Sequence, residues 1–442
     1  MSVVNRLARD IELECKVPTV AASGANVAPY KSYLLKYSNG MPIRSVAIPF
    51  PIAGQPRSVH KTYIEGNDPL TGKPLMQSIV DALTAPLTEE ELVEGIPPGG
   101  EPEPRLLKPD TEANLQKLFK DKEWTDFNVI ALPTEERVAE MLKGTSRKPE
   151  EVVGRSQSGD LTVEKAAVFA VMGGAKPEYF PVILALLTRS GMANSTSSAA
   201  NMIVVNGPIR KEIGMHSGMG VMAPMAEANS VIGRVFTLAG KISGDVRLQG
   251  GAYSSLGSAL QYNNMTVAEN EELLPEGWDS LSVSLGYKPT DNVVSIGMGW
   301  TYISSVGESQ YPYGPQMLIR DYMKALAAPA ATVIMDPTVA RLLKDTHGFN
   351  SKAELAKWLS DNAEVAAGTY WGNGVNATAN GPLGRQGLEP YASWLKMSPQ
   401  SLIKPFSSPK AINVIVTGGD IQTTWFLTDF RFSNGILIDD WR

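Results

Sequence analysis

Residues 202–220 read Met-Ile-Val-Val-Asn-Gly-Pro-Ile-Arg-Lys-Glu-Ile-Gly-Met-His-Ser-Gly-Met-Gly, and this stretch indicates the fold class. The first four residues predict a short apolar strand, which Asn206-Gly207-Pro208 stops. One helical turn is expected over residues 209–213, followed by a glycine-rich loop. Residues 224–240 then carry apolar side chains at spacings of three and four, which predicts a helix. A strand, a turn and a helix in this order are typical of an α/β protein.

The rest of the chain alternates in the same way. We expect an α/β fold with more than one lobe, in which mixed sheets are flanked by helices. Further helices are expected over residues 110–144, 163–172, 177–191, 336–348 and 352–362, with Asp110 and Thr134 as N-caps in the first of these. Further strands are expected over residues 46–51, 281–285, 293–296, 414–416 and 423–426, and the segment 57–61 around His60 also looks like a strand.

Length and linker composition predict several domains. A chain of 442 residues suggests two or three domains. Proline and glycine are dense after residue 95, which favours neither helix nor strand and indicates a linker. The expected division is an N-terminal mixed β/α region (1–95), a linker (96–109), an α/β core with the glycine-rich loop (110–264) and a C-terminal α/β region (265–442).

Composition narrows the function classes. Forty Lys and Arg against 46 Asp and Glu give a formal charge of −6, so no basic excess points to nucleic acid or to an anionic membrane. The apolar segments are shorter than the roughly 20 residues of a spanning helix, and no secretory signal is evident. One cysteine, Cys15, and three histidines do not suffice for an intrachain disulfide or a Cys/His zinc site. We expect a cytoplasmic protein.

The segment from Asn206 to Arg234 is the strongest candidate for a ligand site. Backbone N–H groups of a glycine-rich loop and a helix N-terminus suit a carboxylate or phosphate, and two arginines can clamp such a group. The glycine spacing matches neither the dinucleotide fingerprint nor a P-loop. The alternative is a connection whose glycines only satisfy backbone geometry. The candidate substrate-binding residues are Asn206, Arg210, Ser217, Gly218, Asn229 and Arg234.

His216 lies in the same loop and is a candidate for proton transfer. Histidine is the side chain whose ordinary pKa lies near neutrality. The alternative is an exposed loop histidine without a function. Cys15 lacks a neighbouring histidine, so a nucleophilic role is not favoured.

Two carboxylates, Glu269 and Glu271, form a second candidate. If the segment is extended, they share one strand face, and a close pair can supply one acid and one base. The alternative is a solvated acidic face. A divalent metal at these two residues is not excluded, although no cofactor is evident and no metal site is predicted.

A third candidate lies at the turn of a helical hairpin. Lys176, Glu178 and Tyr179 meet there and are candidate catalytic groups. The alternative is that Tyr179 packs the hairpin.

Six short blocks follow one another along the chain. They are residues 125–126 with 133–138, 162–165, Lys176-Pro-Glu-Tyr-Phe-Pro-Val182, Val204-Val-Asn-Gly-Pro-Ile209, 228–229 with 232–234, and Ala268-Glu-Asn-Glu-Glu272. In this order and spacing they resemble the large, poorly characterised bacterial proteins associated with UGSC-motif (seleno)proteins. The resemblance covers about residues 60–420.

The resemblance implies a thiol or selenol in a Gly-Ser-Cys-type segment, fused or carried by a small separate protein. This chain has no such segment, so either a small cysteine- or selenocysteine-containing partner supplies the thiol, or this protein works without it.

Two functions are therefore expected. The first is an enzyme, or its large subunit, that acts on a small anionic metabolite by lyase, hydrolase or thiol-coupled reductive chemistry. The second is a non-catalytic ligand-binding or scaffold subunit for the redox partner. Methionines around the glycine loop favour the second, because methionine-rich surfaces adapt to partners. A homo- or hetero-oligomer is expected in either case.

Overall fold

The computed structural model describes most of the chain as two compact units. The units are Met1–Pro109 with Leu248–Gly251 and Trp371–Met397, and Asp110–Arg247 with Ala252–Tyr370 and Ser398–Arg442. The described residues are 7–8, 11–25, 44–50, 52, 55–89, 104–156, 159–189, 198–244, 246, 254, 256–306, 314–421 and 423–442. The expected linker lies largely outside them, as does the expected helix end at Gly191.

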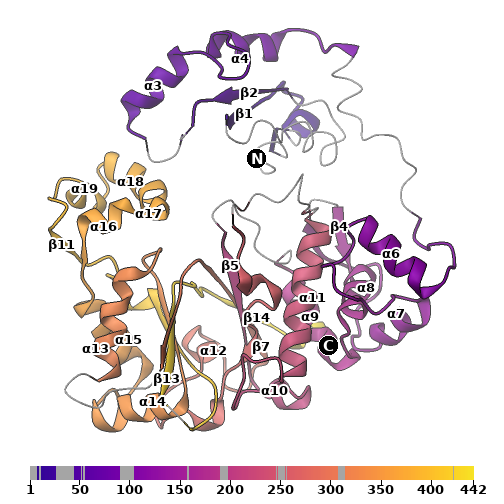
Figure 1. Cartoon of the computed structure of the whole chain (residues 1–442), viewed down its shortest axis with the longest axis vertical. Helices are drawn as coiled ribbons and strands as arrows, with labels where there is room; N and C mark the ends of the chain where they lie inside the picture. Colours follow the sequence, from indigo (N-terminus) through magenta and orange to yellow (C-terminus); the bar gives the residue numbers. More distant parts are fainter. Residues whose placement is uncertain are drawn as a thin grey trace. The chain divides into compact units, whose positions relative to one another are not determined.

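Among the described residues, the second unit contains two mixed four-stranded sheets (Figure 1). The first has the order β14-β7-β5-β6, with β14 Gly435–Leu437, β7 Val293–Gly299, β5 Ala200–Asn206 and β6 Val267–Ala268. The second has the order β12-β9-β13-β8, with β12 Ile412–Val416, β9 Ala331–Met335, β13 Thr424–Thr428 and β8 Tyr302–Val306.

The two sheets repeat one topology and exchange their edge strands. Each has a parallel pair, β5 with β6 and β9 with β12, followed by two antiparallel strands. Strand β8 follows β7 in the chain but pairs with β13 of the other sheet. In the same way, β14 follows β13 but pairs with β7. The chain therefore crosses between the sheets twice, which ties them into one unit.

The two parallel pairs meet at their carboxyl ends. The amide of Asn270, after β6, donates to the carbonyl of Val416 at 2.8 Å, and the hydroxyl of Thr417 donates to the carbonyl of Ala268 at 2.7 Å. Ligands of α/β proteins usually bind outside the carboxyl ends of parallel strands, so this edge is where a site is expected.

Buried helices cover the first sheet, and a core of apolar side chains joins the two sheets. Helices α8 (Val163–Gly173), α9 (Phe180–Leu187) and α11 (Glu227–Ser243) pack together, and α9 contacts β7 (Figure 1). Met202 and Val204 of β5 belong to one buried cluster with Ile334 of β9 and Ile415 of β12. Hydrophobic burial thus fixes the sheets against each other.

The described part of the second unit contains further helices and strands. The helices are α6 Glu112–Asp121, α7 Glu135–Leu142, α10 Ile209–Glu212, α12 Leu281–Ser284, α13 Pro315–Tyr322, α14 Pro337–Arg341 and α15 Lys352–Asn362. The strands are β3 Val152–Ser156, β4 Gly159–Thr162, β10 Val365–Ala366 and β11 Leu402–Ile403. Helix α16 spans Ala367–Gly372, and the division of the chain between the units falls after its residue Tyr370.

The first unit has a two-stranded parallel sheet of β1 (Val20–Gly24) and β2 (Arg44–Ile48). Its helices are α3 Arg57–Glu65, α4 Leu75–Thr84, α17 Gly374–Ala379, α18 Gly381–Arg385 and α19 Tyr391–Trp394. Helix α4 packs on β2, and Arg44 of that strand donates to the carbonyl of Ala85 at 2.6 Å, beyond the end of α4.

The α/β class with mixed sheets is confirmed, whereas several local predictions are wrong. Residues 281–285 form a helical turn instead of a strand, because Ser280 accepts a hydrogen bond from the amide of Val283 and caps it. The segment around His60 is helical and lies in α3. Residues 110–144 form two helices, and the first is capped by Thr111 instead of Asp110.

Candidate functional site

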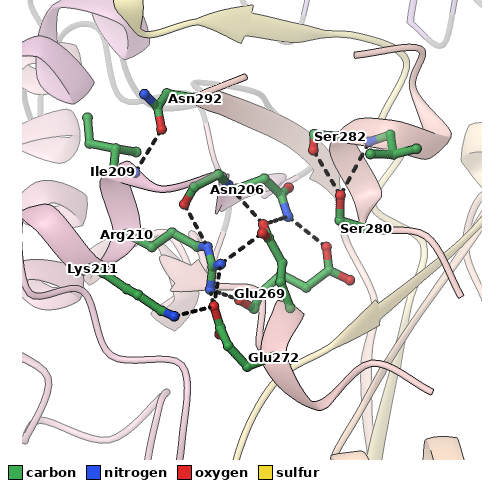
Figure 2. A network of polar contacts seen from close by, with 12 residues as sticks. Asn206, Ile209, Arg210, Lys211, Glu269, Glu272, Ser280, Ser282 and Asn292 are labelled. Atoms are coloured by element: carbon green, nitrogen blue, oxygen red, sulfur yellow. Dashed lines mark hydrogen bonds and ion pairs between the residues drawn. The ribbon is translucent and has the colours of Figure 1, made fainter. Parts of the chain in front are cut away.

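Asn206 lies at the carboxyl end of β5 and joins two carboxylates. Its side chain is buried, and Nδ2 donates to Oε2 of Glu269 at 2.8 Å and to Oε1 of Glu271 at 2.9 Å. Within the described residues, its Oδ1 atom is buried without a hydrogen-bond partner. Figure 2 shows this side chain among the carboxylates of the network. Glu269 and Glu271, two predicted catalytic residues, are therefore both bound to Asn206, a predicted substrate-binding residue.

Glu269 accepts more hydrogen bonds than the other carboxylates of this network. Its Oε1 atom accepts from Lys352 Nζ at 2.5 Å and from the amide of Val416 at 3.2 Å. Its Oε2 atom accepts from Asn206 and, at 2.7 Å, from the amide of Leu281. These donors come from both sheets and from two helices, α12 and α15. Glu269 thus links the two sheets, and its carboxylate has little remaining capacity for a reactant.

Glu269 and Glu271 do not share a strand face as predicted. Strand β6 ends at Ala268, and Glu271 begins a 3-10 turn that ends at Leu273. The two carboxylates meet through Asn206 instead. Oε1 of Glu271 also accepts from the amide of Gly207 at 2.8 Å. Gly207 has a φ of +92°, and a Cβ there would lie 2.3 Å from the carbonyl oxygen of Asp291, so only glycine fits.

Arg210, on the helical turn after β5, directs all five of its N–H groups to protein acceptors. Nε donates to the carbonyl of Gly207 and Nη1 to the carbonyl of Glu269, at 3.0 and 2.6 Å. Nη2 donates to Oε2 of Glu271 at 2.8 Å. The two remaining N–H groups reach Glu272, at 3.3 Å from Nη1 and 3.1 Å from Nη2. The side chain is 4% exposed and held rigidly.

Lys211 and Glu272 form the outer edge of the network. Lys211 Nζ lies 2.9 Å from Oε1 of Glu272, and the two side chains are 70% and 42% exposed. Partial burial disfavours the charged form of Glu272, but the hydrogen bonds from Arg210 and Lys211 outweigh this and lower its pKa to about 2. Glu272 is therefore ionised at neutral pH. Figure 2 shows Lys211 and Arg210 both directed at it.

The glycine-rich loop is held at His216 and Ser217 and reaches the residues after β12. The amide of His216 donates to Oδ1 of Asn229 at 3.0 Å, and Nδ2 of Asn229 donates back to the carbonyl of His216 at 2.9 Å. The carbonyl of Ser217 accepts from the amide of Gly418 at 2.8 Å. Asn270 Nδ2 donates to the carbonyl of the same Gly418 at 3.1 Å. The loop and the carboxylate network thus share the carboxyl edge of the strands.

His216 is exposed, and its Nε2 lies 2.5 Å from the carbonyl oxygen of Met219. A carbonyl can only accept, so this contact places the proton of a neutral imidazole on Nε2 and leaves the lone pair on Nδ1. Gly218 packs under the ring: a Cβ there would lie 3.4 Å from its Cε1 atom. This tautomer makes Nδ1 the basic atom of the loop.

Arg234 forms its ion pair with Asp126 and does not share an acceptor with Arg210. Its Nε and Nη2 atoms donate to the two carboxylate oxygens of Asp126 at 2.9 and 3.1 Å, and Nη2 also donates to the carbonyl of Val129. Partial burial opposes the ionisation of Asp126, but the hydrogen bond from Arg234 prevails and lowers its pKa. The bidentate clamp that the sequence predicted for a ligand is thus formed with a side chain of the protein.

The third predicted group lies at the start of α9. Lys176 Nζ donates to Oε2 of Glu227 at 3.0 Å and lies 5.8 Å from the ring centre of Tyr179. Tyr179 is 3% exposed, and its burial raises the pKa of its hydroxyl, whereas Glu178 is exposed. Tyr179 therefore packs the hairpin, and Lys176 bridges it to α11.

The carboxylate oxygens of Glu269 and Glu271 all face N–H donors, which a cation would have to displace. Within the described part of the chain, no group of three or more His, Cys, Asp or Glu is arranged to hold a metal ion.

Three residues of this network were not among the candidates predicted from the sequence, namely Lys352, Lys211 and Glu272. Lys352 is the first residue of α15, a position that is usually exposed, and nothing local signals its burial. Glu272 belongs to the acidic run that drew attention to its neighbours, and Lys211 follows Arg210 directly. Adjacency to those residues was the available signal for both.

No protein-family model, curated protein or solved structure matches this chain. None of the helices that the structure describes is long and apolar enough to span a membrane.

Proposed function

We propose that the chain is an enzyme, or the large subunit of one, that binds a small organic carboxylate at Arg210 and Lys211. One observation carries the proposal: this pair of cations already holds a carboxylate, that of Glu272, in a half-exposed position. Arginine presents a planar fork that suits a carboxylate, and Arg210 is preorganised by three acceptors behind it, namely Gly207, Glu269 and Glu271.

The place of this pair in the fold supports the same proposal. Arg210 and Lys211 follow β5 directly, at the carboxyl edge where the two parallel pairs meet. His216 comes a few residues later, with Nδ1 as its basic atom, and we assign it proton transfer in a lyase or hydrolase reaction. Ser217, in the same loop, and Asn270, after β6, both bond to the backbone of Gly418, which ties the loop to this edge.

A second candidate function is the large subunit of a redox enzyme with a small thiol or selenol partner. Met219 and Met225 are 61% and 77% exposed, and Ile421 is also exposed. Met219 covers Gly419, where a Cβ would lie 2.1 Å from its Cγ atom. Met222 is partly buried and packs on the core. Exposed methionines beside the site suit the docking of a partner, as the resemblance to UGSC-associated proteins implies.

A cytoplasmic location is part of either proposal. It is supported by the cysteine content, since the single Cys15 cannot form an intrachain disulfide.

The test is titration of the full chain with acetate, malonate and 2-oxoglutarate by calorimetry. We expect at least one of them to bind, and Lys211→Ala to weaken its binding about tenfold, because the substitution removes one of the two cations. Lys211 is 70% exposed, so the variant should fold. Arg234→Ala is the matched control and should leave affinity unchanged. If no carboxylate binds at millimolar concentration, either to the wild type or to the protein with Glu272 replaced by glutamine, the proposal fails.

The second candidate is tested by purifying the protein from its own host and weighing the intact complex. A stoichiometric small thiol or selenol protein, lost in a Met219→Asp/Met225→Asp variant, supports it. A homo-oligomer with no such protein contradicts it.

A further inference from the structure

The carboxylate of Glu272 occupies the surface on which the proposed function places the ligand. It bridges Nη1 and Nη2 of Arg210 and is also bound by Lys211, as a ligand carboxylate would be. Figure 2 shows Glu272 beside the guanidinium of Arg210, with dashed lines to Arg210 and Lys211. The same three donors cannot serve Glu272 and a second carboxylate at once.

The neighbouring carboxylates are held much more firmly. Glu269 is buried and accepts four hydrogen bonds, and Glu271 is 19% exposed and is bound by Asn206, Gly207 and Arg210. Glu272 is bound at its side chain by the two cations, at 2.9 to 3.3 Å, and its side chain is 42% exposed. Water can therefore solvate Glu272 when it leaves, which makes it the member of the network that is easiest to displace.

The backbone around Glu272 does not need to move. It lies in the middle of the 3-10 turn Glu271–Leu273, and Glu271 anchors that turn to the amide of Gly207 at 2.8 Å. Rotation of the Glu272 side chain alone uncovers the fork of Arg210. Side-chain rotation of exposed residues is fast compared with backbone rearrangement.

Charge at this edge favours replacement of Glu272 over addition of a second anion. Arg210 and Lys211 carry two positive charges, and Glu271 and Glu272 carry two negative charges, so the group is neutral as it stands. When Glu272 turns away, one positive charge is left for an incoming carboxylate, and the original balance is restored.

Resting on the proposed function, we infer that Glu272 is an intramolecular competitor that closes the site in the unliganded protein and is replaced by the carboxylate of the ligand. The affinity measured for a ligand is then lowered by the fraction of molecules in which Glu272 occupies Arg210. Glu272 thereby raises the ligand concentration that is needed for binding. It also disfavours anions that bind Arg210 more weakly than a carboxylate does.

The test compares three full-length proteins by calorimetric titration with malonate: the wild type, Glu272→Gln and Glu276→Gln. Glutamine keeps the size of Glu272 and removes the charge that holds it on Arg210. Glu276 is exposed on the same loop, so its variant is a matched control for the loss of one negative charge. Thermal unfolding without ligand first establishes that each variant is folded.

We expect malonate to bind Glu272→Gln at least tenfold more tightly than the wild type, and Glu276→Gln to match the wild type. Equal affinity in all three proteins would contradict the competition between Glu272 and the ligand, and it would leave the proposed function unaffected. Binding to none of them overturns both. An equal gain for Glu272→Gln and Glu276→Gln shows a general charge effect and also overturns the competitor. Inorganic phosphate, titrated in parallel, decides the ligand class: a larger gain for phosphate than for malonate overturns the assignment to carboxylates.

Discussion

The two sheets of the second unit share a topology but differ in the chemistry at the carboxyl ends of their parallel strands. In the first sheet, Asn206 is the last residue of β5 and Glu269 follows β6, and both belong to a buried network of polar and charged groups. In the second sheet, Asp336 follows β9 and caps α14 by accepting from the amide of Val339 at 2.8 Å. Near the end of β12, Asp420 is exposed and pairs with Arg341.

We call the carboxyl ends of the parallel strands the first corner in the first sheet and the second corner in the second sheet. Some polar contacts are needed at both corners, whereas others occur at the first corner. Both corners must satisfy backbone groups at strand ends, and Asp336 does so with little else, accepting also from the amide of Thr424 at 2.6 Å. The first corner adds charged side chains well beyond this requirement, including Arg210 and Lys352. A buried ion pair adds little net stability, because the desolvation of its charges offsets their attraction. The presence of such pairs at the first corner therefore favours a role for that corner in binding.

The largest effect should come from Glu269→Gln. The change leaves the ammonium group of Lys352 buried without its counter-charge, and it turns an NH2 group toward the donors of Asn206 or Val416. We expect a loss of about 3–5 kcal/mol in the free energy of unfolding, measured with urea. Adding Lys352→Met to this variant should recover part of the loss, because the unpaired charge is then removed. A loss below about 1 kcal/mol would show that the polar contacts at the first corner stabilise the fold no more than those at the second.

Gly299→Ala should have the next largest effect, because it lies where the exchanged strands cross. A Cβ at Gly299 would lie 2.5 Å from Oδ1 of Asp429 and 2.8 Å from the amide nitrogen of Phe430. We expect about 1–3 kcal/mol of destabilisation, measured by thermal and urea unfolding. Gly372→Ala is the control, since no atom lies within 4 Å of its added Cβ. Equal stability of the two variants would mean that the crossing tolerates expansion.

Asp336→Asn is the second-sheet counterpart of Glu269→Gln and should cost only about 1 kcal/mol. Asparagine caps helices about as well as aspartate, and the loss is confined to the hydrogen bond from Thr424. Burial raises the pKa of Asp336, so its charge is not strongly stabilised in the folded protein. Urea unfolding at pH 7 of this variant and Glu269→Gln, side by side, measures the difference between the corners directly. Comparable losses would contradict it.

The smallest effect is expected from Glu272 in acid. Its pKa is lowered from 4.5 to about 2 in the folded protein, so the stability that it contributes is complete above pH 4.5 and is lost as the pH falls toward 2. Because the side chain is 42% exposed, we expect well under 1 kcal/mol. Urea unfolding between pH 5 and 2.5 should show a shallower acid slope for Glu272→Gln than for the wild type. Identical slopes would show that the ion pair contributes nothing to folding.

Local sequence signals located much of the fold. The apolar runs at 202–205, 293–296 and 414–416 are strands, and Thr134 caps a helix as predicted, because apolar runs and capping act within a few residues of the chain. The same signals failed at residues 281–285, where an apolar run too short to show its period forms a helical turn.

The sequence by itself determined that an α/β protein carries amide, basic and acidic groups around Asn206 and in the run Glu269–Glu272. Only the tertiary structure decided which of them pair. Lys352 reaches Glu269 across 83 residues, and Arg234 is bound to Asp126, 108 residues away, instead of standing free for a ligand. Such pairings depend on which strands lie side by side and on the exchange of β8 and β14. Spacing along the chain does not encode that arrangement, whereas burial and charge neutrality in the folded protein select it.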